Sequence, residues 1–402
     1  MKKLIIVFLL IILLFPLTGC WSSRELTDLA ITAALGIDKT EKGEFKITVQ
    51  VVNPSEIASS QMGGGGGYDT PVTTYTTTGE ILFEALRKLS TEIPRKVYLA
   101  HLRMIVIGEE VAKEGIYDAL DFLSRDHELR TDFYIVVSKK ETAENTLKIL
   151  TSIEKIPANK LFFSLEKSAE VWAATGKVKL NDLMDDIVSE GTQPALTAVT
   201  VKGEPKEGLT KKNVETISPK ATFVYTGIAA FRKNKLVGWL NEDESKGFNY
   251  IKDNVTSSII IFDMNDDKVA IELMRCKTEI TPQINGQDIT IEVKVTGEAN
   301  VGEVNTKLDL MNPTVIGEIE SKVNTQIQNK IKKTVEKVQN DFESDIFGFG
   351  ERIHKTNPRE WEKIKTEWKD LFPNVPVNVK ADIKIRRIGT ISNPFHEELK
   401  EE

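Results

Sequence analysis

The first twenty residues set the conditions under which the rest of this chain folds. Lys2 and Lys3 form a short basic head, an unbroken apolar run covers residues 4–15, and Leu17-Thr18-Gly19-Cys20 follows. A basic head, an apolar stretch of about a dozen residues and a small-residue cleavage site are typical of a secretory signal peptide. The run is shorter than the roughly 20 apolar residues that a membrane span needs. We therefore expect residues 1–19 to be a signal peptide and the folded body to be exported.

The four residues that end at Cys20 resemble the lipobox of a lipoprotein signal peptide. Such a site implies diacylglycerol on the Cys20 sulfur, cleavage before Cys20 and often a third acyl chain on the new amine. Two or more chains give lasting anchorage, because each buried methylene contributes ~0.8 kcal/mol. The alternative is an ordinary cleaved signal with a chance cysteine, but the sequence has no Ala-x-Ala site. The prediction is lipid attachment at Cys20 and a protein held on the outer face of a membrane.

The number of cysteines and the net charge limit the kinds of protein that the exported part of the chain can be. The chain has two cysteines, so acylation of Cys20 leaves Cys276 alone and excludes an internal disulfide. Stability must then come from ordinary hydrophobic cores, which 402 residues can build as two or three domains. A net charge of −7 argues against a nucleic-acid partner, which requires a basic surface.

The first half of the chain predicts a sheet with crossover helices. Alternating apolar residues favour a hairpin of residues 30–38 and 44–52. Strands are expected at 70–78, 97–108 and 133–137, separated by helices that begin at Gly79-Glu80 and Glu109. Residues 141–200 are expected to be mostly helical. This order of strands and helices is typical of an α/β region, for which we predict residues 20–205, with possible subdomains at about 20–140 and 141–205.

The second half predicts a further α/β domain over residues 219–395. The polar stretch 200–218, with several glycines and prolines, is the best candidate for a boundary. Strands are expected at 223–231, 236–240, 255–262, 269–274, 289–295 and 377–385. Between the last two, apolar residues recur every three or four positions over 313–343, which predicts a long amphipathic helix that packs on a sheet or binds a partner. The fold class predicted is α+β: multi-domain mixed α/β, with several small sheets, packed helices and this long helix.

No constellation of residues predicts catalysis or a metal site. Asp121 with Asp126, or Asp185 with Asp186, could form general acid–base pairs, but surface charge is the commoner role of such residues. The stretch 263–267, which holds three aspartates, lacks the glycine and distal glutamate of a calcium loop. The four histidines have no metal-ligand spacing. The run Gly63 to Gly67 predicts a mobile loop. We expect no enzyme activity, no cofactor and no metal.

Motifs along nearly the whole exported chain resemble the Ger(x)C lipoproteins, the C subunits of spore germinant receptors. The matching segments include Cys20-Trp21, Arg24-Glu25-Leu26, Gly36-Ile37-Asp38, Asp121-Phe122-Leu123-Ser124-Arg125-Asp126, Gly227-Ile228-Ala229-Ala230-Phe231, Lys235-Leu236-Val237-Gly238-Trp239-Leu240 and Asp345-Ile346-Phe347-Gly348-Phe349-Gly350. Ser22 departs from the family, which often has an acidic residue there, and the five-glycine run is private to this chain.

The resemblance implies a non-enzymatic subunit of a nutrient-sensing complex. It implies a place on the outer face of the spore inner membrane, beside two integral membrane subunits, and a fold of three mixed α/β domains. Cys20 is the one functional residue that transfers, as the acylation site. Two alternatives remain: a solute-binding lipoprotein that delivers a small nutrient to a transporter-like membrane partner, and an envelope hydrolase.

Overall fold

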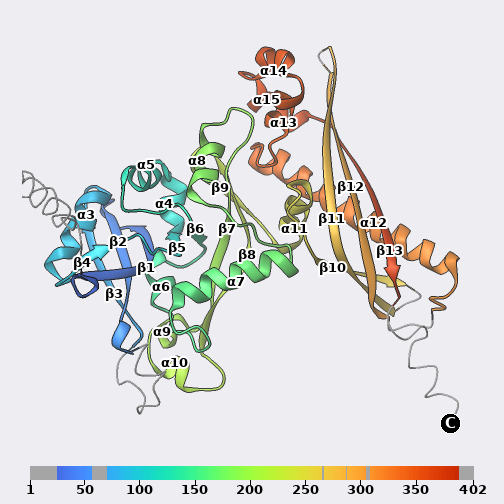
Figure 1. The fold of residues 1–402 in the computed structure, drawn as a ribbon. Helices are drawn as coiled ribbons and strands as arrows, with labels where there is room; N and C mark the ends of the chain where they lie inside the picture. Colours follow the sequence, from blue (N-terminus) through green and yellow to red (C-terminus); the bar gives the residue numbers. More distant parts are fainter. Residues whose placement is uncertain (1–24, 57–69, 265–266, 287, 305–307, 389–402) are drawn as a thin grey trace, which may run out of the picture.

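The computed structural model describes residues 25–56, 70–264, 267–286, 288–304 and 308–388. In these ranges the chain forms an elongated mixed α/β molecule, with a nine-stranded sheet in its N-terminal half and a four-stranded sheet in its C-terminal half (Figure 1). The predicted fold class is confirmed, although the strands gather into two sheets. No helix in the described ranges is long and apolar enough to cross a membrane.

The nine-stranded sheet has a parallel centre between antiparallel margins. Its order is β3-β2-β1-β5-β6-β7-β8-β9, and β4 pairs with the start of β1. The pairs between β1, β5, β6 and β7 are parallel, whereas the hairpin β1–β2 and the pairs β2–β3, β7–β8 and β8–β9 are antiparallel. The strands are β1 Leu29–Lys39, β2 Phe45–Val52, β3 Val72–Gly79, β4 Lys96–Tyr98, β5 Met104–Ile107, β6 Tyr134–Ser138, β7 Ala195–Gly203, β8 Ala221–Arg232 and β9 Lys235–Leu240.

Helices cover both faces of this sheet, as a parallel centre requires. One face packs against α3 (Leu82–Lys88), α4 (Glu109–Glu114), α5 (Tyr117–Arg125) and α8 (Leu180–Val188). The other face packs against α6 (Ala143–Lys148) and α7 (Pro157–Val171). Strand β5 shows why both faces need cover, because Ile105 and Ile107 belong to one core and Met104 and Val106 to the other.

The helix predicted from Glu109 is in fact two short helices, α4 and α5. Gly115 separates them with a φ of 140°, a conformation that side-chain-bearing residues rarely adopt. The break turns α5 away from α4. Likewise, the strand predicted over 97–108 is divided into β4 and β5, which both pair with β1.

The four-stranded sheet has the order β10-β11-β12-β13 and is covered by the long helix α12. Its strands are β10 Ser258–Met264, β11 Asp267–Asn285, β12 Asp288–Val304 and β13 Val377–Arg387. The connection between the parallel strands β12 and β13 holds α12 (Pro313–Lys337), its π-helical continuation Val338–Phe342, α13 (Phe349–Thr356), α14 (Pro358–Ile364) and α15 (Trp368–Leu371).

The long helix packs on the sheet, which was the first of its two predicted roles. Ile319, Val323, Ile327 and Ile331 are buried in the core that α12 forms with the four-stranded sheet. The same core includes Phe248 of α11 (Glu242–Ile251) and Ile228 of β8. The two sheets therefore share one hydrophobic core rather than touching through polar surfaces.

The polar segment after β7 joins two strands of the same sheet. The domain limits drawn from the sequence, 20–205 and 219–395, stay a prediction, and they fall between β7 and β8, which pair from Ala195 with Ala230 to Gly203 with Ala221. The intervening segment carries the short helices α9 (Pro205–Gly208) and α10 (Lys212–Glu215). The chain passes from the first sheet to the second later, between α11 and β10 (Figure 1).

Candidate functional site

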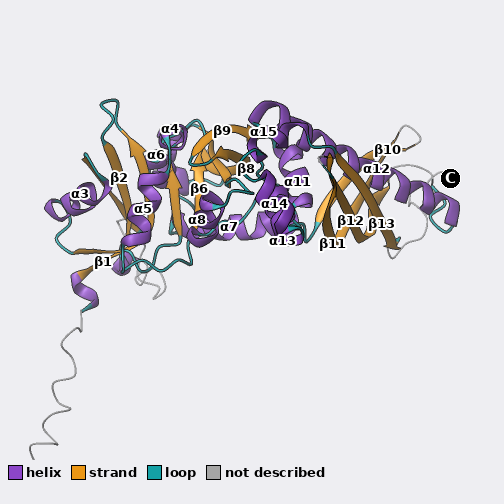
Figure 2. Ribbon diagram, turned by 90° about the horizontal axis from the view of Figure 1, so that it is seen from above, coloured by secondary structure: helices purple, strands orange, loops and turns teal. Residues whose placement is uncertain are grey.

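Cys20, the site residue predicted from the sequence, lies outside the described residues, as does the run Gly63–Gly67. The description begins at Glu25, followed by the 3-10 turn Leu26–Asp28 and β1. Leu29 at the start of β1 pairs with Lys96 of β4. This end of the molecule also carries α3 (Figure 2).

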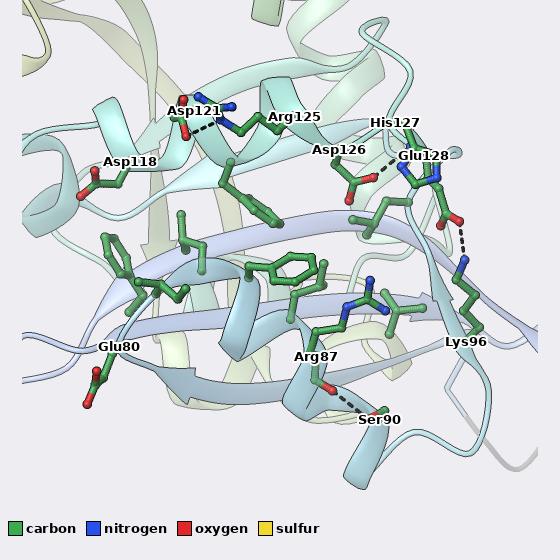
Figure 3. Close-up of a pocket in the computed structure, with 18 of the residues that line it drawn as sticks. Glu80, Arg87, Ser90, Lys96, Asp118, Asp121, Arg125, Asp126, His127 and Glu128 are labelled. Carbon is green, nitrogen blue, oxygen red and sulfur yellow. Dashed lines mark hydrogen bonds and ion pairs between the residues drawn. The ribbon is translucent and has the colours of Figure 1, made fainter.

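A groove of about 790 Å3 lies beside β4, between α3 and α5. We call it the α3–α5 groove (Figure 3). Apolar side chains line it from both helices and from the strands beneath, and two of them on the α3 side, Ile81 and Phe83, remain 60% and 50% exposed. The apolar lining residues are Phe45, Ile81, Leu82, Phe83, Leu86, Val97, Leu99 and Phe122. Exposed apolar surface in a concave site is typical of a binding surface.

Charged side chains divide the groove into two ends. Glu80 and Asp118 lie toward one end, and Figure 3 shows Arg87, Lys96 and His127 toward the other, together with Asp126 and Glu128. The helices α3 and α5 run in the same direction in this view, so acidic residues near both N-termini lie toward the same end, on opposite sides of the groove. That placement also stabilises each helix, because negative charge is favourable near an N-terminus.

Two ion pairs neutralise part of this charge. Arg125 Nε donates a hydrogen bond of 2.8 Å to Asp121, which lowers the pKa of the Asp121 carboxyl below its ordinary value and raises the pKa of Arg125. Lys96 pairs with Glu128 across the other end.

Two arginines at the Lys96 end have no carboxylate partner among the residues that the structure describes. The Arg87 guanidinium lies over the Phe83 ring at 4.8 Å from its centre, and Arg95 makes no ion pair. Both are exposed and line the groove.

The carboxylates singled out from the sequence have structural roles or lie apart. Asp121 is paired with Arg125, and Asp126 accepts the backbone N–H of Glu128 at 2.9 Å. Asp185 is an exposed residue of α8, whereas burial and nearby acidic groups raise the pKa of Asp186 to about 6. Asp186 lines a second, more polar cleft of about 660 Å3 with residues of β11 and α13.

The sequence analysis did not identify the groove. Ile81, at the start of the helix predicted from Gly79-Glu80, is exposed in the structure. Phe83 is the residue that could have indicated the groove from the sequence. It lies outside the apolar face of the predicted helix, and core packing does not explain an aromatic side chain on the polar face. Within the ranges described, no group of three or more histidine, cysteine or acidic side chains is placed to hold a metal ion.

Comparisons with known proteins agree along the full length of the chain. Two family models match: "Spore germination protein N-terminal domain" at residues 22–201, and "Spore germination B3/GerAC like, C-terminal" at residues 226–389. Spore germination protein KC of Bacillus subtilis (strain 168) is 34% identical over 406 residues, which covers 100% of both chains. Spore germination protein B3 of the same organism is 23% identical and covers 94% of this chain and 96% of its own.

A solved structure shows the same fold. The crystal structure of the GerBC protein aligns with a TM-score of 0.53 at 18% identity, and the match covers 87% of this chain and 96% of that one. With the family models and the full-length relative, this agreement confirms the resemblance found in the sequence motifs. The chain therefore belongs to the Ger(x)C family of spore germination proteins.

Proposed function

We propose that this protein is a lipid-anchored, non-enzymatic subunit of a nutrient germinant receptor and takes part in triggering spore germination. It is acylated at Cys20, sits on the outer face of the spore inner membrane and works beside two integral membrane subunits. The observation that carries the proposal is the full-length similarity to proteins named for spore germination. The Leu17-Thr18-Gly19-Cys20 sequence supports the anchor.

Covalent geometry keeps the α3–α5 groove close to that anchor. Leu29 pairs with Lys96, which lines the groove, and Leu29 is the ninth residue after Cys20. A fully extended chain rises at most ~3.6 Å per residue, so the pairing point lies within about 30 Å of Cys20. In the proposed arrangement the groove faces the region just above the bilayer, where parts of membrane subunits emerge.

Replacement of Cys20 tests the anchor. In a sporulating host we expect Cys20→Ala to release the protein from the membrane fraction and to slow germination through its receptor. Cys276→Ala is the matched control, because Cys276 is half-buried in β11 and has no preceding lipobox. If the Cys20→Ala protein stays membrane-bound and germination stays normal, the anchoring proposal is wrong.

A second candidate function is favoured by the size of the groove. Its volume of about 790 Å3 falls within the ~300–1,000 Å3 of small-molecule sites. In this alternative the protein is a solute-binding lipoprotein that delivers a small nutrient to a transporter-like partner. Calorimetry of the detergent-solubilised protein against amino acids and sugars separates the two. Saturable micromolar binding would favour the solute-binding function, and its absence would favour the first.

A further inference from the structure

The two helices that border the α3–α5 groove carry the same charge spacing. Glu80 precedes Arg87 by seven residues beside α3, and Asp118 precedes Arg125 by seven residues on α5. Asp118 and Arg125 both lie within α5, where seven residues rise about 10 Å, whereas Glu80 precedes α3 by two residues. Because the helices run in the same direction, Glu80 and Asp118 lie on opposite sides of the same end of the groove (Figure 3).

The end of the groove near Lys96 holds more basic side chains than are needed to stabilise the C-termini of α3 and α5. Arg95 directly precedes β4, Lys96 is the first residue of β4, and His127 lies in the loop after α5. These groups are therefore not placed to stabilise the C-termini of the two helices. Arg125 and Lys96 already have carboxylate partners, so Arg87 and Arg95 supply two unpaired positive charges against the one carboxylate of Asp126, which has no ion pair in the described ranges. The negative end has Glu80 and Asp118, whose carboxylates form no ion pair in the described part of the chain.

The distance between the two ends restricts the occupant. In a free α-amino acid the ammonium and carboxylate are attached to one carbon, so they cannot reach groups about 10 Å apart. The groove instead needs a basic group and an acidic group separated by apolar surface that covers Ile81, Phe83 and Phe122. A polypeptide segment supplies that pattern, as in other grooves that bind amphipathic segments.

We propose that the α3–α5 groove docks an amphipathic segment of another protein subunit, with its basic end at Glu80 and Asp118 and its acidic end at Arg87 and Arg95. The identification of that protein as a receptor subunit rests on the proposed function. A segment in the reverse direction would bring like charges together, so the charges set the orientation as well as the partner.

Site-specific crosslinking tests the proposal in membranes of dormant spores. A benzoylphenylalanine in place of Phe83 keeps an aromatic ring at a half-exposed position, and one in place of Ile153, which is 92% exposed and outside the groove, is the control. We expect irradiation to join the Phe83 position to one polypeptide. Sequencing of the joined peptide should find an apolar stretch with a basic residue at one end and an acidic residue at the other. The Ile153 position should not capture this peptide.

A charge exchange tests the orientation. The double variant Glu80→Lys with Arg87→Glu reverses the polarity of α3 and leaves the net charge unchanged. Glu318→Lys with Lys332→Glu does the same on the exposed face of α12, where neither residue has an ion pair in the described ranges. We expect the groove exchange to lower the crosslink yield about tenfold, equivalent to ~1.4 kcal/mol, and the α12 exchange to leave it unchanged.

Several results would overturn the docking proposal: crosslinks only to phospholipid, no crosslink, a joined peptide without the charge pattern, or a yield that the groove exchange does not change. Circular dichroism of each variant checks that it is folded. The membrane fraction is measured in parallel and separates this proposal from the anchor. Groove variants should remain membrane-bound, and a Phe83 probe that is anchored normally but gives no crosslink in the otherwise unchanged protein would reject the groove proposal alone.

Discussion

The indole N–H of Trp368 donates a hydrogen bond of 3.0 Å to Oδ2 of Asp345. The same buried carboxylate accepts the backbone N–H groups of Gly348 and Phe349 at Oδ1 and of Gly350 at Oδ2. Asp345 therefore satisfies the free N–H groups at the start of α13, and Trp368 ties the α14–α15 segment to that helix end. This arrangement explains the Asp345-to-Gly350 motif as a structural one.

Trp368→Phe should destabilise the fold by more than Trp361→Phe. Both indoles are buried and lie against each other, but the Trp361 N–H has no hydrogen bond within the described residues. Both substitutions remove similar volume, so the difference isolates the bond to Asp345. We expect a difference of roughly 1–2 kcal/mol in the free energy of unfolding, measured with urea. Equal losses would show that the bond contributes nothing.

Asp38 has a comparable role in the first sheet. Its buried carboxylate accepts the N–H groups of Ala143 at 2.8 Å and Glu144 at 2.9 Å, at the start of α6. Asp38→Ala should leave both donors without a partner and cost about 2–4 kcal/mol. Thr142→Ala removes the exposed cap of the same helix, which bonds to Asn145, and should cost about 1 kcal/mol. Urea unfolding of both variants checks the order, and the reverse order would refute it.

The elements that the sequence predicted correctly are those whose signal is local. The alternation in residues 44–52 and the three-or-four spacing in 313–343 each follow from one buried face, and the structure has β2 and α12 at these places. The break at Gly115 also has a local cause, a positive φ, but glycine alone does not specify it.

The segment between β7 and β8 shows what local signals leave open. A polar segment such as 204–220 has the same composition whether it joins two domains or two neighbouring strands, because both kinds of connection lie in water. Only the hydrogen bonds from Ala195 to Gly203 with β8 distinguish the two cases. The α3–α5 groove is beyond sequence analysis for a related reason, since it depends on how two helices about 30 residues apart are placed on one sheet.

A contact between two glycines joins the first half of the molecule to α13. A Cβ on Gly191 would lie 2.3 Å from the backbone nitrogen of Glu351 and 2.6 Å from the carbonyl carbon of Gly350. Backbone atoms cannot move away without loss of the Glu351 N–H bond to the Gly191 carbonyl, which is 2.8 Å long.

Gly191→Ala should therefore destabilise the protein by about 3 kcal/mol, in the range of other overpacked sites. Gly317→Ala is the control, because a Cβ at this exposed position of α12 meets nothing within 4 Å. It should stabilise by about 0.5–1 kcal/mol through helix propensity. Thermal unfolding of both variants checks the opposite signs, and a Gly191→Ala protein as stable as the parent would contradict the packing argument.

The pKa of Asp186 predicts how stability depends on pH. Burial, and the acidic groups of Asp182, Asp185 and Glu351, raise this pKa from 3.8 to about 6. The folded protein therefore takes up a proton between pH 7 and 5, whereas the unfolded chain does so only near pH 4. By linkage, the ionised carboxylate destabilises the fold above pH 6, and this cost disappears as the pH falls through 6 toward 4.

Asp186→Asn should thus stabilise the protein at pH 8 by about 1–2 kcal/mol, a value below the full linkage because the side chain is partly exposed. The stabilisation should be much smaller at pH 4, where the parent carboxyl is protonated in the folded state and partly protonated in the unfolded chain. Asp185→Asn, at the exposed neighbouring position, removes only one of the lesser charges that raise this pKa and should show a much smaller change between the two pH values. Urea unfolding at pH 8, 6 and 4 measures all three proteins. A stabilisation that is the same at each pH would mean that Asp186 titrates normally, and one that grows toward pH 4 would reverse the sign of the argument.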